Sequence, residues 1–125
     1  EAFSRIKIDQ IACGNVSGSL VIDRQHHVTN RGFIQSAVIT AIVDVVAKVT
    51  CVSVGIDAET LSLNLNLNRR HENIEKIFIQ SNIKHRGRRT VVLTAEVTDN
   101  NDLLLATGII TLAVEGYFDE IPIKW

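Results

Sequence analysis

Residues 32–55 decide the fold, and they read GFIQSAVITAIVDVVAKVTCVSVG. From position 37 to position 54 this stretch is apolar nearly all the way round, whereas a helix on a protein surface has one apolar face and one polar face. Thr40, Asp44 and Lys48 recur every four residues, so in a helix they form a single narrow polar stripe. The pattern therefore predicts a long helix that the rest of the chain surrounds.

Residue types at both ends of the stretch mark where this helix begins and stops. Ser36 belongs to the residues that cap a helix N-terminus, and Gly55 to those that end a helix. At about 1.5 Å per residue, the predicted helix is roughly 28 Å long.

The stretch has two other possible structures, a transmembrane helix and a pair of buried strands. In a membrane, Asp44 and Lys48 would lie near the bilayer centre, at a cost of about 2.5–3.5 kcal/mol each. The many β-branched residues would suit strands, but no turn signal interrupts roughly eighteen residues, which exceeds normal strand length. A buried helix is therefore the better interpretation.

Length and composition fit one compact domain that covers residues 1–125. The apolar fraction is 46% and the net charge is −1, so no strong positive charge draws the chain to nucleic acid or acidic lipid. Cys13 and Cys51 are too few for a disulfide framework or zinc site, and His26-His27 lacks a second pair at metal-ligand spacing. We expect no bound metal. The first residues do not resemble a signal peptide, so we expect a cytoplasmic or organelle-matrix protein.

Strands are predicted on both sides of the helix from runs of alternating and apolar residues. The plainest one is Leu61–Asn68, where leucines occupy one face and Ser62 shares the other face with three asparagines. The acidic residues 56–59 before it are expected to form a loop. Residues 4–12 are expected to form a turn or a strand, and the other predicted strands cover residues 16–23, 74–85, 90–98 and 103–114.

The connections between the last three strands are short, which is typical of antiparallel hairpins. An antiparallel sheet of this size has an apolar face to cover, and the sequence offers a single long helix to cover it. The sheet should therefore curl around the helix. We predict an α+β protein with the hotdog fold, an antiparallel sheet wrapped around one central helix.

With these elements placed, residues 28–114 resemble the hotdog-fold acyl-CoA thioesterases of the phenylacetate-pathway type. In that family an N-x-x-G-x-x-H-G-G segment leads into the central helix, and an acidic residue follows the His by nine positions. Here Gly32 matches the first Gly, Gln35-Ser36-Ala37 takes the place of His-Gly-Gly, and Asp44 follows Gln35 by nine positions. Ser62 matches a Ser on the strand after the helix, and Gly87-Arg88-Arg89-Thr90 matches a turn between later strands.

The resemblance implies hydrolysis of a CoA thioester in a site shared by two subunits. Asp44 of one subunit would act as base or nucleophile opposite the Gln35 loop of the other, and Ser62 would orient the water or the Asp. The backbone N–H groups near Ser36 and Ala37 offer donors for the carbonyl, because the helix dipole favours negative charge there. We expect a homodimer, or a dimer of dimers, with CoA as part of the substrate and no cofactor besides.

Each of these residues also has a simpler interpretation. Asp44 could form an exposed ion pair with Lys48, four residues further along the helix. Ser62 could be one more polar residue of its strand, and Gln35 could cap or fill a turn. The basic residues of the later turn could bind the phosphates of CoA or form a solvated hairpin; they are Lys84, Arg86, Arg88 and Arg89.

These residues can be compared with the needs of four classes of function. An acyl-CoA thioesterase is the prediction, and a non-catalytic hotdog protein that binds acyl-CoA or a protein partner is the alternative. The alternative is favoured by Gln35, an amide that cannot titrate where the family has a His. A hotdog dehydratase or hydratase fits less well, because the context of His27 does not match the His that such enzymes pair with an acid. RNA binding fits poorly, because no aromatic residues accompany the basic turn.

Overall fold

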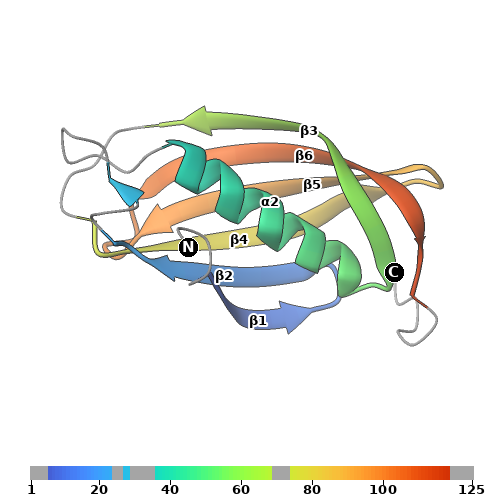
Figure 1. Ribbon diagram of the computed structural model, residues 1–125, viewed down its shortest axis with the longest axis horizontal. Helices are drawn as coiled ribbons and strands as arrows, with labels where there is room; N and C mark the ends of the chain where they lie inside the picture. Colours follow the sequence, from blue (N-terminus) through green and yellow to red (C-terminus); the bar gives the residue numbers. More distant parts are fainter. Residues whose placement is uncertain (1–5, 24–26, 29–35, 69–73, 119–125) are drawn as a thin grey trace.

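The computed structural model describes residues 6–23, 27–28, 36–68 and 74–118, and its elements follow the predicted order (Figure 1). Within these residues, two strands precede the helix and four follow it. The elements are β1 (Lys7–Ala12), β2 (Asn15–Val21), α2 (Ser36–Val52), β3 (Ile56–Leu67), β4 (Lys76–Arg86), β5 (Thr90–Asp99) and β6 (Leu104–Tyr117).

The helix α2 is buried along one face, so a single copy of the chain does not surround it as predicted, and Ala37, Val45 and Val52 are exposed on the other face. Its buried residues are Val38, Ile39, Ile42, Val43, Val46, Ala47, Thr50 and Cys51. The polar stripe of Thr40, Asp44 and Lys48 lies on the remaining side, where these side chains are exposed or half-buried. Gly55 ends the helix as predicted: its φ of 81° is a left-handed conformation that favours glycine, and its N–H donates to the Val52 carbonyl at 2.9 Å. In the described part of the chain, no helix has the length and hydropathy needed to cross a membrane.

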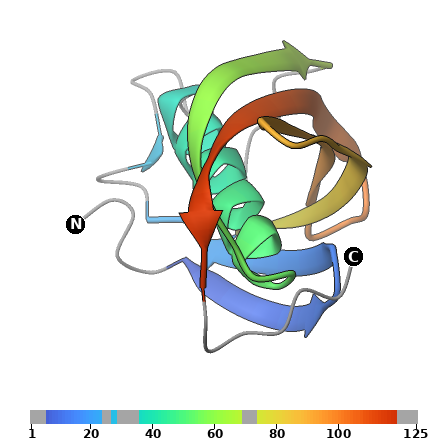
Figure 2. The ribbon, with the colours of Figure 1, turned by 90° about the vertical axis from the view of Figure 1, so that its right-hand side faces the viewer.

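The strands form one six-stranded antiparallel sheet in the order β1-β2-β4-β5-β6-β3. β3 pairs with β6 and so lies at one edge, while β1 lies at the other. The sheet curls around α2 (Figure 2), and its inner side chains pack against the helix. Burying one Leu or Ile side chain fully stabilises the fold by about 1.5–3 kcal/mol compared with leaving it exposed. The fully buried residues include Leu20, Ile77, Leu93, Ile110 and Leu112. The chain has the predicted hotdog fold.

The expectation of a loop over residues 56–59 is wrong. β3 begins at Ile56, directly after Gly55, and this segment pairs with the last residues of β6. Ile56 and Ala58 are buried while Asp57 and Glu59 are exposed. The acidic residues therefore alternate with apolar ones along a strand, which brings the start of β3 alongside the second half of α2.

Candidate functional site

Asp44 lies in the middle of α2, and its carboxylate has partners on both of its oxygens. The hydroxyl of Thr60 on β3 donates a short hydrogen bond to Asp44 Oδ1. Lys48, one turn further along the helix, places Nζ 3.5 Å from Asp44 Oδ2. The Asp44 side chain is 32% exposed, so water can reach it. Because an ionised carboxylate has about four acceptor sites, both oxygens keep free lone pairs.

A β-bulge in β3 decides which residues of that strand face Asp44. The pairing with β6 shifts between Thr60 and Ser62: Thr60 lies opposite the buried Leu112, whereas Ser62 lies opposite Thr111. Thr60 therefore faces the helix. Ser62 is exposed and shares the outer face of the sheet with the asparagines that follow it. The structure does not bring Ser62 together with Asp44, and Thr60 takes the position beside the carboxylate.

Lys48 connects Asp44 to the strand beside it. Its Nζ lies 3.5 Å from Glu59 Oε2 as well as 3.5 Å from Asp44 Oδ2. The Asp44 carboxylate is the main cause of a raised Lys48 pKa; partial burial opposes this rise, and Glu59 adds to it. Lys48 is therefore charged at neutral pH. The ion pair between Asp44 and Lys48, the simpler interpretation of Asp44, is therefore present. The same carboxylate also accepts the hydrogen bond from Thr60.

A groove of about 560 Å³ opens in front of Asp44, between α2 and β3. At its far end lie Ser36 and Ala37, whose backbone N–H groups belong to the first helical turn and have no partner within the helix. Ser36 and Asp44 lie two turns apart along the helix, about 12 Å. Gln35 lies outside the described residues. The groove is lined by Ser36, Ala37, Thr40, Ala41, Asp44, Thr60 and Leu63.

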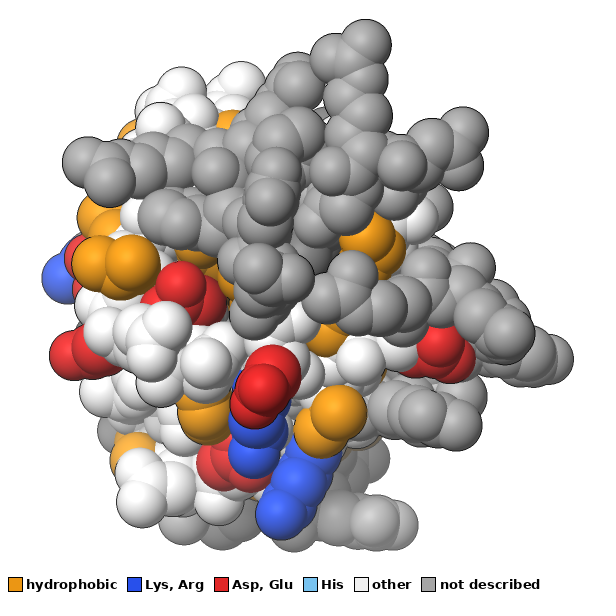
Figure 3. Space-filling model, turned by 90° about the vertical axis from the view of Figure 1, so that its left-hand side faces the viewer, with side chains coloured by type: hydrophobic (Ala, Val, Ile, Leu, Met, Phe, Trp, Pro, Cys, Tyr) orange, Lys and Arg blue, Asp and Glu red, His pale blue; other side chains and the backbone are white. Residues whose placement is uncertain are grey.

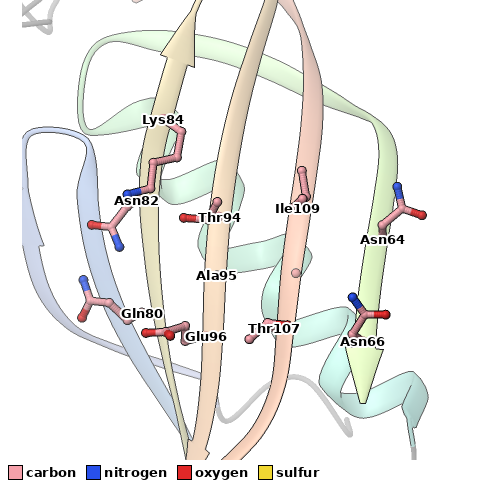
Figure 4. A pocket seen from close by; sticks show the side chains of 11 residues that line it. Asn64, Asn66, Gln80, Asn82, Lys84, Thr94, Ala95, Glu96, Thr107 and Ile109 are labelled. Carbon is pink, nitrogen blue, oxygen red and sulfur yellow. The ribbon is translucent and has the colours of Figure 1, made fainter. Parts of the chain in front are cut away.

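The predicted phosphate-binding residues lie elsewhere in a single copy of the chain. The turn between β4 and β5 is at the end of the sheet where α2 stops, and the helix begins at the opposite end (Figure 1). Arg88 and Arg89 are exposed there. Arg86 stacks its guanidinium 5.8 Å from the centre of the Tyr117 ring. Lys84 points to the outer face of the sheet (Figure 4). One copy therefore does not bring these four residues to the groove.

The outer face of the sheet carries a second hollow of about 430 Å³. It is polar, with amide, hydroxyl and charged side chains spread over four strands (Figure 4). These side chains include Asn64 and Asn66 of β3, Gln80 and Asn82 of β4, and Glu96 of β5. The sheet separates this hollow from Asp44, so it does not belong to the candidate site.

Other reactive groups do not form a centre in the described residues. No three His, Cys, Asp or Glu among them gather to hold a metal ion. Cys51 is fully buried in α2, and burial raises the pKa of its thiol to about 11, so it stays protonated at neutral pH. His26 lies outside the described residues. At the end of the molecule where α2 begins, acidic and basic side chains both appear (Figure 3).

Comparisons with solved structures give the same fold as the sequence predicts. No protein-family profile and no curated protein matches the sequence. A Streptococcus mutans protein bound to acetyl-CoA matches with a TM-score of 0.87 and 22% identity over 94% of both chains. A hypothetical thioesterase of Streptococcus pneumoniae with coenzyme A gives a TM-score of 0.88 and 19% identity, over 94% of this chain and 91% of that chain. Escherichia coli PaaI, from the phenylacetic acid degradation operon, gives 0.84 and 15%, over 90% of this chain and 81% of that chain.

Two further structures of the Streptococcus pneumoniae protein each carry one substitution, one of an Asp by Ala and one of a Thr by Ala, at positions sixteen apart. The solved neighbours show that the chain resembles hotdog thioesterases in fold.

Proposed function

We propose that the protein is an acyl-CoA thioesterase in which Asp44, Thr60 and the first backbone N–H groups of α2 act on the thioester. The hydrogen bond between Thr60 and Asp44 in the groove carries this proposal. Support comes from the separate alanine substitutions of an Asp and a Thr in a hypothetical thioesterase of this fold, since those two positions are sixteen apart, as Asp44 and Thr60 are. The neighbours that hold acetyl-CoA and coenzyme A support a CoA thioester as the substrate class.

The chemistry requires an activated oxygen and a stabilised carbonyl. As a base, Asp44 takes a proton from water while the water oxygen bonds to the thioester carbon; the intermediate then expels the CoA thiolate, which takes the proton from Asp44. As a nucleophile, Asp44 itself bonds to that carbon and expels the thiolate, and water then hydrolyses the mixed anhydride. In both routes the N–H groups near Ser36 and Ala37 stabilise the oxyanion, each typically by about 2.7–4 kcal/mol. Thr60 orients the carboxylate, the role that the sequence resemblance gives to Ser62.

Two copies of the chain would complete this site. About 12 Å of helix separates Asp44 from Ser36, which is too far for both to act on one thioester. A second copy related by a twofold axis would place its helix start next to the Asp44 of the first. The open edge of β3 and its 62%-exposed Leu61 are the surface that such a copy would cover. Sedimentation at micromolar concentration should show a dimer or a dimer of dimers; a stable monomer would exclude the shared site.

The same arrangement gives the basic turn a role. If the two helices run antiparallel across the twofold axis, the turn of one copy approaches the groove of the other. Arg88 and Arg89 would then contact CoA phosphates, with Lys84 and Arg86 close by on the same hairpin. CoA enters as part of the substrate. A carboxylate and backbone donors supply the whole reaction, so the mechanism uses no further cofactor.

A non-catalytic acyl-CoA-binding protein is the second candidate, and the residue before the helix favours it. The sequence places Gln35, an amide that cannot titrate, where the family has a His. This candidate binds the same ligand and differs in the absence of turnover.

The deciding experiment is a panel of acyl-CoA substrates assayed by release of free thiol. We expect turnover with at least one substrate, and Asp44→Asn should lower it by at least about 10²-fold with the fold intact, because Asn is nearly isosteric and cannot take the proton. Asp57→Asn is the matched control, since Asp57 is an exposed acid at the start of β3 that does not line the groove. Binding of acyl-CoA without turnover in the parent protein would establish the second candidate.

A further inference from the structure

Arg86 and Tyr117 form a stacked pair at the end of the sheet where α2 stops, the end that also carries the β4–β5 turn (Figure 1). The Arg86 guanidinium lies 5.8 Å from the centre of the Tyr117 ring. The tyrosine nevertheless stays 47% exposed, so part of the ring is open to a ligand. We propose that this pair is a stacking platform for the adenine base of coenzyme A. The identity of the ligand rests on the proposed function.

A β-bulge in β4 decides which side of the sheet Arg86 is on. The pairing with β5 shifts between Ile83 and His85, so Lys84 is an extra residue at that point. Arg86 consequently lies opposite Val91, which is fully buried. Paired residues lie on the same face of a sheet, so Arg86 belongs to the face that packs against the helix. Regular alternation from the buried Ile83 would have put Arg86 on the outer face.

A second bulge, in β6, has the same effect on Tyr117. The pairing with β3 shifts between Asp57 and Ala58, so Glu115 is the extra residue of β6. Tyr117 consequently lies opposite Ile56, which is fully buried. Because β5 separates β4 from β6, two irregularities in non-adjacent strands bring the guanidinium and the ring together. Bulges of this kind often re-aim a side chain next to a functional site.

The basic turn lies beside this stacked pair. Arg88 and Arg89 follow Arg86 by two and three residues. The Arg89 carbonyl accepts a hydrogen bond from the Val114 N–H at 2.8 Å, and Val114 precedes Tyr117 on β6 by about 10 Å of strand. A nucleotide carries its base and its phosphates on one ribose, so it needs a stacking surface and cations close together. Aromatic rings and guanidinium planes stack on bases, and further guanidinium groups bind phosphate.

A simple surface contact is the other interpretation, and the chain contains a matched example. The Lys76 ammonium lies 5.1 Å from the centre of the Phe78 ring, which is 37% exposed. Phe78 precedes Arg86 on β4 by eight residues, about 26 Å, so this pair lies far from the basic turn. Exposed cation–ring contacts contribute little to folding. Stability therefore cannot separate the two interpretations, whereas nucleotide binding can.

The first measurement uses Tyr117 as a probe, because it is the single tyrosine of the chain. In the full chain labelled with ring carbon-13 tyrosine, all labelled resonances come from this residue. The titrants are adenosine 3′,5′-bisphosphate and, separately, inorganic pyrophosphate, which has phosphates but no base. We expect the bisphosphate to shift the ring resonances through the ring current of the stacked base, and pyrophosphate at equal saturation to shift them far less. Equal shifts from both titrants would overturn the proposal, because phosphate charge alone would then explain them.

The second measurement is the Kd for coenzyme A in calorimetry. Tyr117→Leu should raise it about tenfold, the loss typical of one base–aromatic stack. Tyr117→Phe keeps the ring and should stay within about twofold of the parent. Phe78→Leu is the matched control and should leave the Kd unchanged. A Tyr117→Leu value within about twofold of the parent would overturn the proposal, as would an equal loss in Phe78→Leu. The NMR titration uses the parent chain, so it tests the platform even if Tyr117→Leu does not fold.

Thiol release from acyl-CoA separates this proposal from the proposed function. If the parent shows the base-dependent shift at Tyr117 but hydrolyses no thioester, the adenine platform stands and the thioesterase assignment falls. If the parent hydrolyses acyl-CoA while Tyr117→Leu binds coenzyme A as the parent does, the thioesterase assignment stands and the platform falls.

Discussion

Thr60 and Ser62 are two residues apart on β3 and face opposite sides of the sheet. A regular strand would point both to the same face. The bulge between them adds one residue, so Thr60 pairs opposite the buried Leu112 and Ser62 opposite Thr111. This local irregularity gives Asp44 its hydroxyl partner and leaves the nearby serine on the outer surface.

Substitution of the two hydroxyl residues should therefore have unequal effects. Thr60→Val keeps the β-branched shape and removes the donor to Asp44, so we expect kcat to fall about tenfold or more, the value of a hydrogen bond to a charged group. Ser62→Ala should leave kcat within about twofold, because it removes an exposed hydroxyl. Thr60→Ser should keep most of the activity. If Thr60→Val and Ser62→Ala lowered kcat equally, the proposed location of the site on the helix-facing side of β3 would be wrong.

Much of the fold was predictable because the decisive features are periodic. The apolar stretch around Ile42 and the stop at Gly55 specify α2, and alternation specifies most strand boundaries to within a few residues. The sequence of Ile56–Glu59 predicts a loop wrongly, because its two acids are typical of loops and its alternation spans only four residues. Its partner is the far end of β6, and such a long-range pairing leaves no local signal.

The site was less predictable than the fold. Asp44 became a candidate through the family resemblance, which places an acid nine positions after Gln35, and the four-residue interval predicts its ion pair with Lys48. Thr60 could not be predicted, because a bulge depends on the register between β3 and β6 rather than on the residues of β3 alone. Alternation from Leu61 onward correctly put Ser62 with the asparagines, and that observation already placed it on the face away from the helix.

Charge reversal at Arg88 and Arg89 should weaken coenzyme A binding more than it changes stability. Both side chains are exposed at the β4–β5 turn, where charges contribute little to folding, whereas contacts to phosphate are charge-assisted. We expect Arg88→Glu with Arg89→Glu to raise the Kd for CoA at least about tenfold in calorimetry, with the unfolding midpoint nearly unchanged. Unchanged affinity would show that the turn is only a solvated hairpin.

Ser81 provides a prediction about the core beneath the helix. Its hydroxyl is fully buried on the inner face of β4 and has no hydrogen-bond partner among the described residues. Ser81→Ala should therefore leave the free energy of unfolding unchanged or raise it by up to about 1 kcal/mol. Thr50→Val is the matched comparison, since the Thr50 hydroxyl donates to the Val46 carbonyl at 2.7 Å, and its loss should cost about 1 kcal/mol. Urea unfolding measures both, and a large loss in Ser81→Ala would reveal a partner for that hydroxyl.

Cys51 should make stability fall at alkaline pH. Burial raises the pKa of its thiol from 9.0 to about 11, so the folded protein keeps this proton to higher pH than the unfolded chain. Below pH 9 both states are protonated and the contribution is complete; between pH 9 and pH 11 the unfolded state releases its proton first, and stability declines as pH rises. The loss should reach about 3 kcal/mol at most. Lys48, whose pKa is raised above 10.5, adds a smaller loss in the same direction only beyond that pH.

Urea unfolding at intervals from pH 8 to pH 10.5 under reducing conditions should therefore show a steeper decline for the parent protein than for Cys51→Ala. Parallel curves for the two proteins would mean that the Cys51 thiolate is tolerated inside the fold.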